Sequence, residues 1–379
     1  MKKENFQICK RCVMDITDPE IYFDNQGICN HCNEFDKFTS KKWFPNQEGK
    51  KKLNIIFDKI KNYNVNEDYN CIIGLSGGID SSYLALLVNE YKLRPLVIHV
   101  DAGWNSELAV NNIEKIVKYC GYDLHVHVMD WLEIKDLQLA YLKAGVSNQD
   151  VAQDHAFFAS LYHYATKNRI KYILTGGNLA TESVFPKTWH HSAMDSINLK
   201  SIHSRYGQKK LKNYKTISFF EYYFYYPFIK GMTVIRPLNF LPYNKSDAIK
   251  FLKEKVDFKD YGRKHGESRF TKFFQNYYLP KKFNMDKRLP HLSSLILSGT
   301  ISRNQALEEL KKPLYEKIEL QEDKIYIAKK LGISVIELDK LIKKKGNHYS
   351  DYSNWDIYYK VLLKIKKFFK KFYEIKSYS

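Results

Sequence analysis

One short segment constrains the fold of this chain more than any other. The apolar run 71–75 (CIIGL) leads into 76–81 (SGGIDS), and the largely apolar stretch 81–91 follows. The short run predicts a buried strand and the longer stretch a buried helix. Two glycines at a strand-to-helix turn let the backbone approach an anion, which the first amides of the helix bind. The segment therefore predicts an α/β unit with a phosphate-binding loop.

The side chains of this loop indicate the kind of phosphate chemistry. The Ser76 and Ser81 hydroxyls are donors to phosphate oxygens, whereas the negative charge of Asp80 suits a bridging Mg²⁺. The loop lacks the lysine of the Gly-x-x-x-x-Gly-Lys-Ser/Thr loop. It resembles instead the loop of enzymes that split ATP between the α- and β-phosphates, and this resemblance implies ATP binding with Mg²⁺ and a catalytic role for Asp80. The predicted loop residues are Leu75, Ser76, Gly77, Gly78, Ile79, Asp80 and Ser81.

Strand and helix patterns alternate after the loop. Strands are expected at 95–100, 124–128, 172–175 and 234–238, and helices at 108–119, 131–143, 150–168 and 244–255. This alternation predicts a doubly wound parallel sheet. Its ligand crevice lies outside the carboxyl ends of the strands. Further cofactor-binding candidates therefore follow the later strands: Val100, Asp101, Gly176, Gly177, Asn178, and Glu182 as a second Mg²⁺ carboxylate.

Four of the six cysteines form two Cys-x-x-Cys pairs, Cys9/Cys12 and Cys29/Cys32, separated by 16 residues. Two such pairs match a structural zinc site with four thiolates. An iron–sulfur cluster is the alternative that the spacing leaves open. We expect three parts: a zinc module at 1–40, an α/β domain at 53–255 and a helical, basic region at 256–379.

The formal charge of +19 suits nucleic acid, an anionic membrane or phosphorylated substrates, and it also fits a bias in composition. With no long apolar run and no apolar signal-peptide core, the expected location is the cytoplasm. The stretch 360–376 is a basic amphipathic helix candidate. It could rest on an anionic membrane or pack its apolar face on preceding helices, and we expect the packing.

The motifs together resemble one family. The loop is similar to that of the N-type ATP pyrophosphatases, the PP-loop superfamily with an adenine-nucleotide alpha-hydrolase-like fold. The cysteine module, the loop, 175–183 (TGGNLATES) and 261–306 resemble the N-acetyl sugar amidotransferases of lipopolysaccharide O-antigen and pseudaminic-acid-type glycan biosynthesis. The resemblance covers most of residues 5–345.

This resemblance implies a reaction and a partner. The enzyme would transfer AMP to the N-acetyl amide oxygen of a nucleotide-linked or free sugar. Ammonia would then displace AMP to give an acetamidino sugar. We find no glutaminase motif in the chain. The resemblance implies a separate glutaminase with a barrel subunit, similar to imidazole-glycerol-phosphate synthase, as the ammonia source.

Cationic residues of 261–306 complete the predicted site. His265, His291 and Lys272 are catalytic candidates, because histidine can accept a proton near neutral pH. Substrate-binding candidates are His155, Arg269, Lys287 and Arg288. A solvated helical face is the structural alternative for each.

Two other functions remain open at this point. A tRNA thiolation enzyme of the same superfamily also combines cysteine pairs with this loop, but only Cys71 and Cys120 follow the cysteine module. A non-catalytic protein that binds nucleotide and zinc is the other. We expect the sugar reaction and do not expect a nucleic-acid partner.

Overall fold

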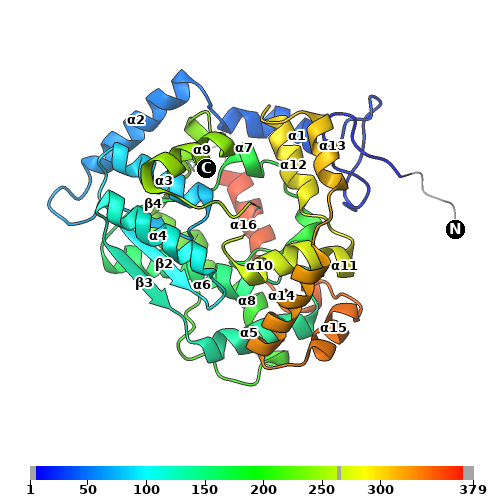
Figure 1. Cartoon of the computed structure of the whole chain (residues 1–379). Helices are drawn as coiled ribbons and strands as arrows, with labels where there is room; N and C mark the ends of the chain where they lie inside the picture. The colour runs from blue at the N-terminus through cyan, green and yellow to red at the C-terminus, as the bar shows by residue number, and fades with distance from the viewer. Residues whose placement is uncertain (1–5, 263–265, 370–379) are drawn as a thin grey trace.

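The computed structural model describes residues 6–262 and 266–369, and within them a five-stranded parallel sheet lies in the α/β part (Figure 1). The strands are β1 (Cys71–Gly74), β2 (Pro95–Asp101), β3 (Leu124–Val128), β4 (Tyr172–Leu174) and β5 (Thr233–Ile235). Their order is β3-β2-β1-β4-β5, with every neighbouring pair parallel. The chain extends to β2 and β3 on one side of β1 and to β4 and β5 on the other. This order confirms the doubly wound α/β prediction.

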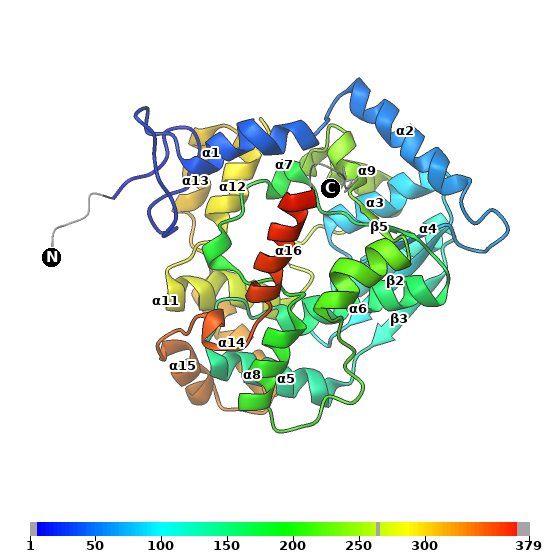
Figure 2. The same cartoon turned by 180° about the vertical axis from the view of Figure 1, so that it is seen from behind.

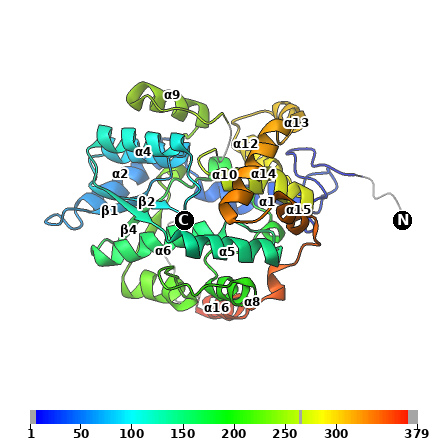
Figure 3. The same cartoon turned by 60° about the horizontal axis from the view of Figure 1, so that its bottom comes forward.

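Helices cover both faces of the sheet, because alternate strand residues point to opposite faces (Figure 3). Ile72 belongs to one apolar cluster, whereas Cys71 and Ile73 belong to another. The second cluster includes α2 (Gln47–Lys61), α3 (Ile79–Glu90), α4 (Glu107–Cys120) and α9 (Lys245–Val256). The first includes α5 (Trp131–Ala144), α6 (Val151–Lys167) and α8 (Ser196–Tyr206).

The direction of α6 matters for the site. A Cβ atom placed on Gly74, the last residue of β1, would lie 2.3 Å from Cζ of Phe157, so α6 packs directly on β1. The helix leads back to the amino end of β4 and therefore runs opposite to the strands. Its first turn, with Asp150 and Asp154, consequently extends beyond the carboxyl end of β1.

The chain after residue 266 is helical, as predicted. Its α-helices are α10 (Arg269–Phe273), α11 (Leu279–Phe283), α12 (Arg288–Leu297), α13 (Arg303–Lys311), α14 (Lys317–Leu331), α15 (Val335–Lys343) and α16 (Asp356–Phe369). Ile327, Leu331 and Leu338 pack in the same apolar cluster as Ile72 and Ile98. The helical region thus shares a core with the sheet.

Short elements connect these parts. They are α1 (Asn30–Glu34), α7 (Leu179–Glu182), η1 (Phe35–Thr39), η2 (Ser40–Lys42), η3 (Lys187–Trp189), η4 (Glu221–Ile229), η5 (Pro237–Phe240), η6 (Phe274–Tyr278) and η7 (Tyr349–Asp351). The strand expected at 234–238 ends at Ile235 instead, since Pro237 has no N–H for a ladder and opens η5. Among the described residues, no helix is both long and apolar enough to cross a bilayer.

Candidate active site

The predicted phosphate loop joins β1 to α3 next to β4, where the direction of chain winding reverses. Such a switch point forms the ligand crevice of an open α/β sheet. The loop curls around two hydroxyl groups: Ser76 Oγ accepts from the Gly78 amide at 3.2 Å, and Ser81 Oγ donates to the Gly78 carbonyl at 3.1 Å. Gly78 is the N-cap of α3 and brings no capping side chain. The first amides of α3 therefore suit an anion.

Two glycines hold the loop in place through contacts that exclude a side chain. Gly77 has φ +79°, and a Cβ atom on it would lie 2.6 Å from the Ala109 carbonyl oxygen. A Cβ atom on Gly176, after β4, would lie 2.8 Å from the carbonyl carbon of Asp80 and 2.9 Å from the Ser81 nitrogen. The structure thus brings the two glycine turns of the sequence analysis into direct contact.

Two carboxylates and a phenol gather beside this contact. The Tyr243 hydroxyl donates a hydrogen bond to Asp80 Oδ1. Burial raises the pKa of Tyr243, and the charges of Asp80 and Glu182 raise it further. Glu182 Oε2 and Arg236 Nε lie 3.6 Å and 3.8 Å from the position of a Cβ on Gly177. Asp80 and Glu182 thus both lie close enough to Tyr243 to affect its pKa, and a Mg²⁺ ion shared by the two carboxylates stays a prediction; Tyr243 and Arg236 are additions.

Asp101, after β2, shapes a turn. Its Oδ1 accepts from the Gly103 amide at 2.7 Å and from the Asn105 amide group at 3.1 Å. The same Asn105 group donates to His99 Nε2, and His99 Nδ1 donates to the Leu75 carbonyl oxygen at 2.9 Å. This chain of bonds connects the end of β2 with the start of the phosphate loop.

The region after residue 260 reaches the loop through backbone pairing. The Ser106 amide donates to the Glu267 carbonyl at 2.9 Å, and the Arg269 amide to the Trp104 carbonyl at 3.1 Å. A Cβ atom on Gly78 would lie 3.3 Å from Glu267 Oε1. The Tyr261 hydroxyl donates to the Gly77 carbonyl at 2.8 Å. Tyr261 and Glu267, from the signature 261–306, therefore lie against the phosphate loop.

Other predicted cofactor-binding residues have structural roles. Leu75, Ile79 and Val100 are buried in the core. Asn178 Oδ1 accepts from the Thr181 amide and hydroxyl, so its side chain caps α7. The Asn178 side chain is thus used to cap α7, and a role of its backbone in nucleotide binding stays a prediction.

The prediction for His155 is wrong. Its ring is fully buried, with Nδ1 donating to the Ala193 carbonyl at 2.8 Å and Nε2 accepting from the Ile217 amide at 3.1 Å. Burial lowers its pKa to about 4. Both ring nitrogens are engaged within the core, so His155 cannot bind a substrate.

Three cations of the C-terminal region also need correction. Lys272 pairs with Asp323 at 2.5 Å and with Glu319 at 3.0 Å, and Arg269 pairs with the same Asp323. Arg288 bonds both oxygens of Asp286 and the carbonyl oxygens of Glu309, Leu310 and Lys312 at the end of α13. These groups hold α10, α12, α13 and α14 together instead of contacting a substrate.

Lys287 and His291, at the start of α12, lie near the site. Lys287 Nζ donates to His190 Nε2 at 2.5 Å, and burial followed by the Lys287 charge lowers the pKa of His190. His291 Nδ1 donates to the Thr181 carbonyl at 3.1 Å, one residue before Glu182. His265 lies outside the described residues, and its role stays a prediction.

An acidic pair that the sequence analysis missed lies at the first turn of α6. Asp150 Oδ1 accepts from Gln153 at 2.8 Å and from the Thr271 hydroxyl at 3.1 Å. Burial and the Asp154 charge raise the pKa of Asp150, whereas Lys287 opposes this rise. Burial raises the pKa of the half-buried Asp154 to about 7. Within 6–262 and 266–369, no hydrogen bond or ion pair engages the Asp154 carboxylate.

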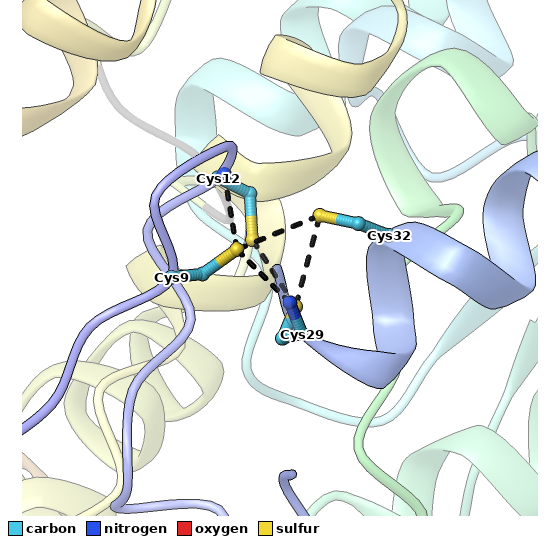
Figure 4. Close-up of side chains that lie close together, drawn as sticks. All are labelled: Cys9, Cys12, Cys29 and Cys32. Carbon is cyan, nitrogen blue, oxygen red and sulfur yellow. Dashed lines mark hydrogen bonds between the residues drawn. The ribbon is translucent and has the colours of Figure 1, made fainter. Parts of the chain in front are cut away.

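The four N-terminal cysteines meet in one buried cluster (Figure 4). Their sulfur atoms all lie within 4.8 Å of one another, with Sγ–Sγ distances of 3.6 Å for Cys12/Cys29, 3.7 Å for Cys29/Cys32 and 3.8 Å for Cys9/Cys32. Four thiolates bound tetrahedrally to one zinc ion lie about 3.8 Å apart. A four-iron cluster would separate them further, because each thiolate would bind a different iron. The geometry fits a single ion.

The cysteine module docks on the C-terminal helices. The Arg303 guanidinium donates to the Cys9 carbonyl at 2.9 Å and to the Cys12 carbonyl at 3.0 Å. The Val13 amide donates to the Ser293 hydroxyl at 3.3 Å. The module therefore supports α12, the helix that carries Lys287 and His291.

Comparisons with known proteins match parts of this chain. Residues 267–366 match the family model described as "LPS biosynthesis protein WbpG-like, C-terminal domain". A curated relative, the uncharacterized protein MJ1599 of Methanocaldococcus jannaschii, is 31% identical over 131 residues. That match spans 33% of this chain and 44% of the relative, less than half of the relative's length.

Solved structures give weaker likenesses. NMN synthetase from Francisella tularensis is 14% identical with a TM-score of 0.35, over 72% of this chain and 98% of that one. The U34-tRNA thiolase NcsA from Methanococcus maripaludis, with its [4Fe-4S] cluster, is 16% identical with a TM-score of 0.35, over 81% and 90%. The NH3-dependent NAD synthetase from Campylobacter jejuni is 14% identical with a TM-score of 0.33, over 72% and 99%. At these scores the likenesses carry no functional argument.

The family match and the geometry coincide in one place. The match begins at Glu267, the residue whose carboxylate lies against Gly78 of the phosphate loop. This agreement confirms the family resemblance that the sequence motifs indicated. Residues 267–366 of this chain are similar to the C-terminal domain of WbpG-like lipopolysaccharide biosynthesis proteins.

Proposed function

We propose that this protein uses ATP to convert the N-acetyl group of a sugar into an acetamidino group, in the synthesis of a surface glycan. The observation that carries the proposal is the contact of Gly78 with Glu267. It joins an ATP-type loop to the first residue of a lipopolysaccharide-biosynthesis domain. An enzyme that acts on the sugar with AMP needs both in one site.

The residues at the loop fit ATP with Mg²⁺. The amides of 76–81 suit phosphate oxygens, and Asp80 and Glu182 supply the oxygen ligands that Mg²⁺ prefers. A bound Mg²⁺ neutralises charge on the departing pyrophosphate. Arg236, beside Gly177, adds a fixed positive charge on the β5 side.

The chemistry follows from the low reactivity of an amide. The amide oxygen attacks the α-phosphorus of ATP, a P–O bond to pyrophosphate breaks, and AMP remains on the oxygen. Ammonia then attacks the amide carbon, and the C–O bond breaks to release AMP. AMP is a far better leaving group than oxide, which is why the activation step is needed.

Asp154 is the residue best suited to the ammonia step. An ammonium ion has no lone pair, so it must lose a proton before its nitrogen attacks carbon. A carboxylate with a pKa near 7 can accept that proton at neutral pH. We assign Asp154 the role that the sequence analysis gave to His265 and His291.

The ammonia source remains a proposal that rests on the family. A separate glutaminase with a barrel subunit would deliver ammonia to the site. The purified chain should accordingly use ammonium salts and leave glutamine untouched. Glutamine-dependent turnover by the chain alone would contradict this part of the account.

The buried thiols argue against tRNA thiolation. Burial raises the pKa of Cys120 to about 12 and raises that of the fully buried Cys71 as well. A sulfur carrier needs an accessible thiolate. Cys71 and Cys120 also lie in the cluster of the α3 face, not with the acidic pair.

Pyrophosphate release tests the proposal. It should depend on the N-acetyl sugar and fall by about 100-fold in Asp80→Asn, which removes the carboxylate charge. The Cys71→Ala/Cys120→Ala variant serves as the control and should retain the activity. Release that is indifferent to sugar, or lost with the two cysteines, would contradict the proposal.

A further inference from the structure

We propose that α16 and the aromatic side of η4 form a surface that docks on an anionic lipid bilayer. The proposal does not rest on the reaction and would hold for another substrate. The surface lies on the side of the molecule that faces away from the viewer in Figure 1. Figure 2 shows this side, with α16 in the foreground.

An apolar stripe runs along α16. Ile357, Val361 and Ile365 recur at every fourth residue, so they share one face of the helix. Their side chains are 74%, 50% and 46% exposed. Trp355 and Leu362, on the other side, are buried against the protein. Of the stretch 360–376, Leu362 packs as expected, whereas Val361 and Ile365 do not, and residues 370–376 lie outside the described residues.

A basic stripe lies beside the apolar one. Lys360, Lys364 and Lys367 follow helical spacing and are exposed. Between residues 356 and 367 the sequence contains one acidic residue, Asp356. A helix with an exposed apolar stripe and a lysine stripe can lie in the interface of an anionic membrane.

The aromatic residues of η4 extend the apolar surface. Phe228 and Ile229 are 61% and 65% exposed. A series of ring contacts connects them to α16: Phe228 to Phe224 at 6.4 Å, Phe224 to Phe219 at 6.5 Å, and Phe219 to Tyr358 at 5.8 Å between centroids. The exposed residues of η4 are therefore connected to α16 by a series of ring contacts.

Charge selects a bilayer over a second copy of the chain. A symmetric dimer through this patch would place the same surface on both partners. The lysine stripes of the two copies would then oppose each other. Each whole chain also carries a formal charge of +19, which adds to the repulsion. Anionic headgroups complement the lysines, and the acyl region takes the apolar side chains.

Vesicle sedimentation with the whole chain tests this assignment. Binding to phosphatidylglycerol vesicles should exceed binding to phosphatidylcholine vesicles and weaken with salt. Lys360→Glu/Lys364→Glu/Lys367→Glu and, separately, Ile357→Ser/Val361→Ser/Ile365→Ser should each weaken it by about 10-fold or more. A matched control is Ile318→Ser/Ile336→Ser, which changes two exposed isoleucines on α14 and α15.

Each outcome of this experiment either supports or overturns the proposed membrane surface. Selective loss in the α16 variants, with unchanged melting temperature and sugar-dependent activity, supports the surface. Absence of vesicle binding by the native chain, or equal loss in the control, overturns it. Concentration-dependent dimerisation that Ile357→Ser/Val361→Ser/Ile365→Ser abolishes would assign the patch to a second copy. That result would also overturn the proposed membrane surface.

Discussion

The Glu267 carboxylate lies against the backbone of Gly78, so that a Cβ atom on Gly78 would lie 3.3 Å from Glu267 Oε1. The two residues are far apart in the sequence, and the pairing of Ser106 with Glu267 brings them together. The phosphate loop and the WbpG-like domain therefore form one site.

Gly176→Ala should destabilise the protein. Its Cβ would lie within 3 Å of backbone atoms of Asp80 and Ser81, which cannot move without shifting α3. We expect a loss of about 1–3 kcal/mol in the free energy of unfolding. In Gly177→Ala, the matched control, the new Cβ meets its neighbours at 3.6 Å or more, and stability should stay within about 0.5 kcal/mol. Equal denaturation midpoints for the two variants would contradict the packing.

Asp154→Asn should separate the two half-reactions. The substitution keeps the shape but removes the proton acceptor, so amidine formation should fall by about 100-fold while sugar-dependent AMP transfer persists. In the native protein the amidine-forming rate should rise with pH through about 7, because only the carboxylate accepts a proton. Stopped-flow or quench measurement of both steps gives the answer; an unchanged profile in the variant would exclude this role.

The same residue predicts a stability effect. The pKa of Asp154 is raised in the folded protein, so the folded state holds its proton to higher pH than the unfolded state does. Its contribution to stability is therefore present below the ordinary aspartate pKa and is lost as pH rises through about 7. The stability difference between Asp154→Asn and the native chain should therefore depend on pH. It should shift in favour of the variant as the pH rises from acidic values to above 7. Parallel urea-unfolding curves at all pH values would contradict this sign.

Arg303→Ala should loosen the cysteine module. The change removes charged hydrogen bonds to the Cys9 and Cys12 carbonyls, at a cost of about 2 kcal/mol. Arg11→Ala is the control, because its pair with Asp36 is exposed and contributes about 1 kcal/mol or less. Limited proteolysis within residues 6–40 should rise in the first variant alone.

Metal analysis tests the cluster itself. One zinc per chain is expected, with no iron, since the spacing of the four sulfur atoms fits a single ion. Cys29→Ser should lose the metal and unfold the module, because metal binding supplies folding free energy to a small module. Iron with acid-labile sulfide would show that the thiolates hold a cluster instead.

The strands and the phosphate loop could be predicted because local patterns specify them. Alternation of apolar runs marks each strand, and the loop follows β1 directly in the sequence. The cysteine site was equally visible, since spacing within 9–32 determines it.

The substrate wall could not be predicted in the same way. Successive residues on a helix point about 100° apart, so the side chain of Asp154 lies on another face of α6 than that of His155, which enters the core. Arg269 and Lys272 look like free cations in the sequence, but Asp323, on a later helix, neutralises both. Tyr243 and Arg236 become visible only when β5 is placed beside β4.

The most direct test is mass spectrometry of nucleotide-linked N-acetyl sugars incubated with the protein, ATP, Mg²⁺ and an ammonium salt. The product should be a sugar in which one NH group has replaced the amide oxygen, and it should form together with AMP and pyrophosphate. Use of ¹⁸O-labelled N-acetyl sugar should place the label in AMP. ADP with phosphate as products, or AMP formed without the label, would contradict the central claim.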